Sequence, residues 1–237
     1  ENGEYRFQDG RLESGEEEIQ RYKQLGFAVL LSANPYGVPT DTDPQTRLDN
    51  YLLSSGAAAV ELAELGELYN VEYFSPANEF EGSLANEQFP DFLQSPNPPE
   101  TPFDPHDEGT NRRVEVASEW FRNVLPDLRS RFSGGLIAKV GGAHNGYRVD
   151  GYDYLGFTID HQYLDQEDFR RLIGIQYTQI AEAASASGVS WMVGEAYFHH
   201  SEPSLDLDQA TKDFLEGMQE HYFDISLDEY MNFSGSL

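Results

Sequence analysis

The chain reads Val71-Glu72-Tyr73-Phe74-Ser75-Pro76-Ala77-Asn78-Glu79 in its first half and Trp191-Met192-Val193-Gly194-Glu195-Ala196-Tyr197 in its second half. Each stretch is a short apolar run rich in β-forming residues that leads into a glutamate, and each is followed by loop residues and then a helical pattern. In a barrel of parallel strands, residues at the carboxyl ends of the strands form the active site. Two glutamates that converge there from different strands are candidates for an acid/base and a nucleophile.

Strands and helices alternate along the chain. Periodicity predicts strands at residues 27–31, 71–74, 136–140, 154–159 and 191–193, and helices at 16–24, 46–68, 111–131, 166–187 and 208–222. The strands read as continuous apolar runs, which is typical of a parallel sheet covered on both faces. We therefore predict an α/β fold and one (β/α)8 TIM barrel domain over residues 1–237, since such barrels need about 250 residues. An open doubly wound sheet is the alternative that the same pattern allows.

A proline-rich segment at residues 89–109 separates the second predicted strand from the helix that follows it. We expect a long loop there, of the kind that forms a lid or a cleft wall. Some aromatic residues of the predicted loops could stack on a sugar, although aromatics scattered in this way are more often part of a core. They are Tyr36, Phe80, Phe103, Tyr147 and Phe198.

Acidic residues outnumber basic residues by 42 to 15, which gives a formal net charge of −27. Such a charge makes a compact protein repel itself, and concentrated salt screens that repulsion because the Debye length falls to about 3 Å at 1 M. We therefore predict a protein from a salt-loving organism. The 15 phenylalanines and 14 tyrosines argue for a packed core rather than a disordered acidic chain.

The same charge makes nucleic acid and anionic membranes poor partners, because phosphate repels it. The sequence holds no apolar run long enough to span a bilayer. It also holds no cysteine, which excludes disulfides, thiolate metal sites and a cysteine nucleophile. We expect a soluble protein, and the composition is equally compatible with the cytoplasm and with secretion.

The order of these motifs resembles glycoside hydrolase clan A, the retaining glycosidases built on TIM barrels, in particular its mannanase-like and cellulase-like families. In that clan an Asn-Glu pair ends the fourth strand and a second glutamate ends the seventh, with two strands between them. Asn78-Glu79 looks like the first motif and Glu195 looks like the second. His161-Gln162-Tyr163 is similar to the His-x-Tyr at the tip of the sixth strand in several members.

The resemblance implies a role for each of these residues. Glu79 would be the general acid and then the base, and Glu195 would be the nucleophile. Asn78 would donate to a sugar hydroxyl near the scissile bond, and Tyr163 would hydrogen-bond to Glu195 with His161 beside it. The implied substrate is an oligo- or polysaccharide with β linkages, and the reaction needs no cofactor and no metal.

Two parts of the barrel depart from the clan pattern. Only 26 residues precede the strand at 27–31, too few for two strands and two helices if that strand is the third. Residues 223–227 are the candidate for the eighth strand, and no tryptophan, which is common there in the clan, lies near them. We therefore expect a fragment of a longer protein, or a barrel that another chain completes.

Two other functions remain as alternatives. The first is a non-catalytic saccharide-binding or structural protein on a glycosidase-like barrel. The second is a metal-dependent barrel enzyme, which would need three or four converging ligands. His199-His200 with Glu202 and the run His106-Asp107-Glu108 contain metal-capable side chains. Adjacent side chains of an extended segment point in opposite directions, so we expect no metal site at either.

Overall fold

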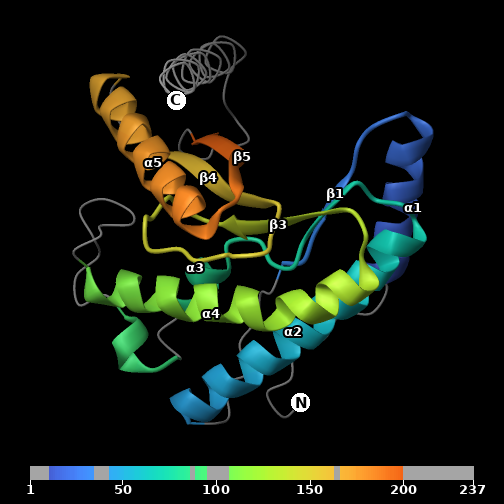
Figure 1. The fold of residues 1–237 in the computed structure, drawn as a ribbon, viewed down its shortest axis with the longest axis horizontal. Helices are drawn as coiled ribbons and strands as arrows, with labels where there is room; N and C mark the ends of the chain where they lie inside the picture. Colours follow the sequence, from blue (N-terminus) through green and yellow to red (C-terminus); the bar gives the residue numbers. More distant parts are fainter. Residues whose placement is uncertain (1–10, 35–42, 86–88, 95–106, 163–165, 200–237) are drawn as a thin grey trace, which may run out of the picture.

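The computed structural model describes residues 11–34, 43–85, 89–94, 107–162 and 166–199. They form a parallel sheet of five strands in chain order, β1 to β5 (Figure 1). The strands are β1 (Leu30–Ser32), β2 (Tyr73–Ser75), β3 (Gly135–Val140), β4 (Tyr154–Gln162) and β5 (Ser190–His199). A doubly wound sheet reverses its strand order at a switch point, whereas each of these strands pairs with the next in sequence. The order is that of a barrel wall, and the doubly wound alternative is wrong.

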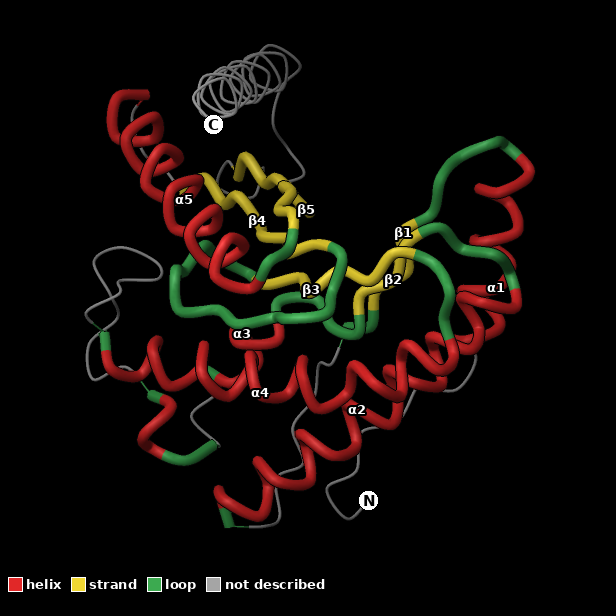
Figure 2. Tube along the Cα trace, in the orientation of Figure 1, coloured by secondary structure: helices red, strands yellow, loops and turns green. Residues whose placement is uncertain are grey.

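The helices are α1 (Arg11–Gln24), α2 (Pro44–Leu68), α3 (Phe80–Leu84), α4 (Glu108–Arg131) and α5 (Gln166–Ser187), with a 3-10 turn η1 at Asp91–Leu93. In Figure 2, α2 and α4 cross on one side of the row of strands, and α5 packs against β4 and β5. An aspartate carboxylate caps the N-terminus of each of the two longest described helices, α2 and α4. Asp43 accepts hydrogen bonds from the first-turn amides of α2, and Asp107 accepts one from Thr110 N at 2.7 Å in α4.

The contact between α2 and α4 depends on a glycine in the middle of α2. A Cβ atom at Gly56 would lie 3.0 Å from Val124 Cγ1 of α4. The indole of Trp120, also on α4, donates to the Leu52 carbonyl at 2.9 Å. The predicted helix at 46–68 is therefore continuous through Gly56, because the close approach of α4 offsets the low helix propensity of glycine.

An aromatic stack fixes the short helix α3 against this pair of helices. Phe80 stacks on Trp120 with ring centroids 4.0 Å apart and on Tyr51 with centroids 5.5 Å apart. All three side chains are buried. Since Phe80 is the first residue of α3, the stack also fixes the residue before it, which is Glu79.

The prediction of a strand at 27–31 within a sheet covered on both faces is wrong in two respects. The strand begins at Leu30, and Phe27 is 59% exposed while Leu30 is 37% exposed. Within the described residues β1 pairs only with β2, so it is an edge strand that lacks a neighbour on its other side. Apolar content alone does not distinguish an edge strand from a central one.

The other predicted elements agree more closely with the structure. The helix at 166–187 has the predicted bounds, and the strand at 136–140 begins one residue earlier. The helix predicted at 111–131 begins at Glu108, so α4 shortens the expected proline-rich loop. Residues 95–106 of that loop, the helix at 208–222 and the strand candidate at 223–227 lie outside the described residues. No described helix is both long enough and apolar enough to cross a membrane.

Candidate active site

A buried lysine lies between the two glutamates. Lys139 belongs to β3, and its side chain is 4% exposed. Its ammonium donates hydrogen bonds to Thr158 Oγ1 at 3.1 Å and to Glu195 Oε2 at 2.7 Å. It also donates to Asn78 Oδ1 and lies 3.7 Å from Glu79 Oε1. One cation therefore joins β4, β5 and the turn that follows β2.

Glu195 reaches this cation from inside a strand rather than from its end. The sequence predicts a strand that stops at 193, whereas β5 continues to His199. The register with β4 shifts beside Glu195, because Phe157 pairs with Val193 while Thr158 pairs with Glu195. Gly194 is the extra residue at this bulge, and a Cβ there would lie 3.2 Å from Lys139 Cε. The bulge thus makes room for the lysine side chain next to the glutamate.

Glu79 stands on a sharp turn at the start of α3. It is the N-cap residue of this helix, and its backbone has a left-handed conformation (φ 54°, ψ 49°) that residues other than glycine rarely adopt. The turn is fixed by hydrogen bonds from Ser75 Oγ to the Ala77 carbonyl (2.6 Å) and from Asn78 N to the Ala33 carbonyl (2.7 Å). A strained backbone at a residue with a functional side chain is a frequent feature of active sites.

The two carboxylates are close together and reach solvent. Lys139 Nζ lies 3.7 Å from Glu79 Oε1 and 2.7 Å from Glu195 Oε2. These two carboxylate oxygens are therefore at most about 6.4 Å apart. The side chains of Glu79 and Glu195 are 31% and 27% exposed, whereas that of Lys139 is 4% exposed. The ammonium therefore lies beneath two carboxylates that a ligand can reach.

A hydroxyl links the cation to Glu79. Thr158 Oγ1 accepts from Lys139 Nζ and donates to Glu79 Oε1 at 2.5 Å. Glu195 instead accepts directly from the ammonium. The two carboxylates therefore have different surroundings, although they share one cation. An ammonium in direct contact stabilises the ionised form of a carboxylate more than an ammonium at a longer distance does.

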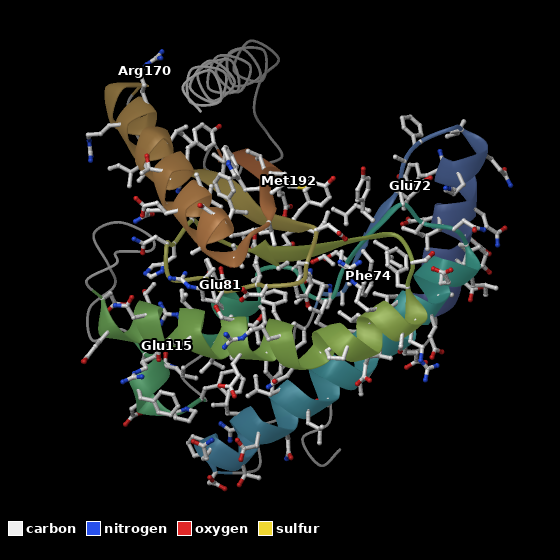
Figure 3. The ribbon with its side chains drawn as sticks, viewed as in Figure 1. Glu72, Phe74, Glu81, Glu115, Arg170 and Met192 are labelled. Carbon is white, nitrogen blue, oxygen red and sulfur yellow. The ribbon has the colours of Figure 1, made fainter. Side chains whose placement is uncertain are left out.

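A third carboxylate lies behind Glu79. Glu81, in the first turn of α3, is fully buried, and burial raises the pKa of its carboxyl to about 7. Its Oε1 atom accepts from the backbone amides of Gly141 (2.5 Å) and Gly142 (3.3 Å), directly after β3. Figure 3 shows Glu81 between α4 and this connection.

The structure brings together three of the five residues predicted from the sequence, namely Asn78, Glu79 and Glu195. His161 lies on β4, but its side chain is outside the described part, and Tyr163 lies wholly outside it. Two of the aromatic residues considered for sugar stacking, Phe80 and Tyr147, are fully buried and belong to the core.

Sequence reasoning missed Lys139, Thr158 and Glu81. The available signal for Lys139 was a single charge inside an otherwise apolar strand, since a buried charge requires a partner. No comparable signal marks Thr158 or Glu81, because threonine is common in strands and glutamate is common in the first turn of a helix.

Two features lie apart from this site. A cavity of about 580 Å³ lies between α2 and α4, lined by residues such as Leu52, Val60 and Val124, and it includes none of the residues around Lys139. No group of three or more His, Asp or Glu side chains that could hold a metal ion occurs within the described ranges. Of the two metal-capable runs in the sequence, each lies at least partly outside those ranges.

The sequence matches no protein-family model and no curated protein. Among solved structures, the chain is similar to a GH113 β-1,4-mannanase, with a TM-score of 0.59 and 15% identity over 97% of this chain and 68% of that chain. It is also similar to a GH5-4 broad specificity endoglucanase from an uncultured bacterium, with a TM-score of 0.57 and 11% identity over 95% of this chain and 66% of that chain. The chain has the fold of the clan A glycosidases.

A further structure with this clan A fold is a GH113 β-mannanase from Alicyclobacillus acidocaldarius, with a TM-score of 0.50 and 12% identity over 83% of this chain and 56% of that chain. The chain thus spans between 56% and 68% of the length of these three glycosidases. In the clan A pattern two strands separate the Asn-Glu pair from the second glutamate. Here β3 and β4 lie between the turn with Asn78-Glu79 and the strand with Glu195.

Proposed function

We propose that this protein is a retaining glycoside hydrolase that cleaves a β-linked saccharide, with Glu79 as acid/base and Glu195 as nucleophile. The observation that carries this proposal is the unequal position of Lys139 Nζ, 2.7 Å from Glu195 and 3.7 Å from Glu79. The nearer carboxylate is the better stabilised as an anion, which suits a nucleophile, and the farther one can more easily hold the proton of a general acid.

The spacing of the carboxylates is compatible with retention. Retaining glycosidases have carboxyl groups about 5–5.5 Å apart, whereas inverting enzymes need roughly 6.5–9.5 Å to admit a water molecule. One oxygen of Glu79 and one of Glu195 are at most about 6.4 Å apart, a limit that accommodates the retaining spacing.

The proposed reaction has two steps. In the first, Glu195 attacks the anomeric carbon while Glu79 gives its proton to the leaving oxygen, and a glycosyl ester forms. In the second, the ionised Glu79 takes a proton from water, and that water displaces Glu195. With the proton on Glu79, the negative charge of Glu195 is balanced by the buried Lys139, so the three groups together carry no net charge.

We propose Asn78, His161 and Tyr163 as substrate-binding residues around these two groups. Asn78 accepts from Lys139 through Oδ1, which leaves its amide nitrogen to donate to a sugar hydroxyl. The saccharides to test first are β-1,4-mannan and β-glucan oligosaccharides, because the similar structures are described as a β-1,4-mannanase and an endoglucanase.

Kinetics of variants at the two glutamates test the assignment. Glu195→Ala should lose about 10³-fold or more in kcat, and added azide should restore turnover with an inverted glycosyl azide as product. Glu79→Ala should keep activity on substrates with an activated aryl leaving group and give the retained azide. Glu61→Gln on the exposed face of α2 is the matched control. Parental turnover in Glu195→Ala would exclude this nucleophile, and sugar binding without turnover in the parent would favour a binding protein.

We further propose that strands beside β1, from the same protein or from a second polypeptide, close the barrel. Within the described residues β1 pairs only with β2, and another strand there could also cover the exposed side chains of Phe27 and Leu30. Sedimentation of the active species tests whether a second polypeptide supplies these strands. Full activity in a monomer of 26.8 kDa would exclude a second polypeptide.

A further inference from the structure

The turn after β3 is held to the turn with Glu79 by one buried side chain. Glu81 Oε1 accepts from Gly141 N at 2.5 Å and from Gly142 N at 3.3 Å. These two residues follow the strand that carries Lys139, and Glu81 lies two positions after Glu79. The carboxylate therefore joins the two segments from which the ammonium and the general acid project.

The two segments fit together without spare room. A Cβ atom at Gly141 would lie 2.9 Å from Glu81 Oε1 and 3.3 Å from Glu79 Cβ. Between the Glu81 carboxylate and the Glu79 side chain there is thus no room for a side chain at Gly141. We expect a displacement of this turn to move Glu79 as well.

We propose that Glu81 is a positioning residue that holds the general acid Glu79 in place, by tying the turn after β3 to the turn that carries Glu79. This inference rests on the function proposed above. Its geometric part is independent of the substrate, because it concerns contacts between the protein's own residues.

The Glu81 carboxyl is protonated at acidic pH. Burial raises the pKa of Glu81 to about 7, and the Glu79 carboxylate contributes in the same direction. Two other titratable groups face Glu81, namely Arg113 of α4 and Tyr147 of the connection between β3 and β4. A protonated carboxyl still accepts from the Gly141 and Gly142 amides through its carbonyl oxygen, so this contact does not require Glu81 to be ionised.

Glu81→Ala tests this contact, because alanine removes the acceptor of the two glycine amides. We expect kcat to fall about tenfold while KM stays unchanged, because a misplaced acid affects the chemical step. Glu81→Gln keeps the size of the side chain and an oxygen that can accept from both amides, so it should restore kcat to near the parental value.

Glu67→Ala is the matched control. The Glu67 carboxylate also accepts from a backbone amide, that of Ser133 at 2.8 Å, but Glu67 is exposed and Ser133 precedes β3. This variant should leave kcat unchanged. An equal fall of kcat in Glu67→Ala and Glu81→Ala would mean that the loss of any buttressing carboxylate, not the contact of Glu81, is responsible, and would overturn the proposal.

Gly141→Ala disturbs the same contact from the opposite side and serves if Glu81→Ala does not fold. The added methyl group should displace the Glu81 carboxylate, lower kcat and leave KM unchanged. Gly174→Ala on α5, where a Cβ would meet nothing within 4 Å, is its control and should behave as the parent protein. Parental kcat in both Gly141→Ala and Glu81→Ala would overturn this proposal while leaving the glycosidase intact. A parent that cleaves no saccharide would refute the proposed function and, with it, the role of Glu81.

Discussion

At the scale of single residues, the unusual feature of this site is a buried ammonium shared by two carboxylates that reach solvent. Breaking a buried ion pair leaves charges without compensation, and here the charges left behind are those that the proposed reaction uses. Lys139 therefore affects chemistry more directly than stability. The partly exposed carboxylates can regain water, which limits any loss of stability when the cation is removed.

Lys139→Met should shift the pH dependence of hydrolysis. Without the ammonium, Glu79 and Glu195 repel each other, so the nucleophile ionises less readily. We expect the low-pH limb of kcat/KM to move up by about one unit or more, measured with an aryl glycoside. Lys23→Met is the control, because Lys23 pairs with Glu72 at the opposite end of β2 (Figure 3). An unchanged low-pH limb in Lys139→Met would contradict the charge assignment.

Glu81 should make the stability of the protein depend on pH. The ordinary pKa of the carboxyl is 4.5, and burial raises it to about 7 in the folded protein. Stability from this group is then fully present below pH 4.5 and is lost as the pH rises through 7. Between these limits the free energy of unfolding should fall by about 3 kcal/mol.

Urea unfolding at pH 4.5 and pH 8 measures this change in the free energy of unfolding. Glu81→Gln has no titratable group at the position, so its stability relative to the parent should improve by about 3 kcal/mol between the two pH values. Glu67→Gln, at an exposed carboxylate, should keep a constant difference from the parent. Parallel pH profiles of the parent and Glu81→Gln would contradict the prediction.

At the scale of elements, the crossing of α2 and α4 supports the short helix that begins next to Glu79. Gly56 lets the helices approach, and Trp120 of α4 stacks on Phe80 of α3. Packing between helices thus determines where a strained turn at the site lies, although none of these side chains carries the proposed chemistry.

Gly56→Val should lower the free energy of unfolding by about 1–3 kcal/mol, because the new side chain overlaps Val124. Ala57→Val is the matched control. Ala57 is exposed one position further along α2 and lines the open cavity beside α4, so a valine there has space and its cost is that of helix propensity, below about 1 kcal/mol. Urea unfolding measures both, and an equal loss in the two variants would mean that the helix contact has no packing constraint at Gly56.

At the scale of the whole molecule, the net charge of −27 dominates the solution behaviour. We expect the Tm to rise from low salt to 2 M KCl, because the Debye length at such ionic strength is below about 3 Å and repulsion between surface carboxylates is screened. Thermal unfolding followed by circular dichroism measures it. A Tm that falls over this range would refute the prediction of a salt-adapted protein.

A charge-reduced variant serves as the control for this salt effect. Replacing four exposed glutamates by glutamine removes four negative charges without touching the site, and the rise in Tm with KCl should become smaller. The positions are Glu17, Glu18, Glu61 and Glu119. An equal rise in the variant would indicate a general salt effect on apolar burial instead.

The sequence by itself determined the alternation of strands and helices, the α/β class, and the two segments that bring Glu79 and Glu195 to one place. These follow from periodicity and from residue order, which are local properties of the chain. The pairing register of these strands and the burial of their residues could not be predicted from the sequence. The exposed edge at β1 and the extension of β5 past Glu195 depend on which strands pair, and local pattern carries no information about pairing.

Only the tertiary structure decided which charged groups meet in the site. Lys139 contacts Asn78 across 61 positions of sequence and Glu195 across 56, and Glu81 reaches Gly141 across 60. Such contacts form because parallel strands bring distant segments to one edge in a particular register. Burial then strengthens the interaction between the charges that meet there, and burial is a property of the packed molecule rather than of any residue type.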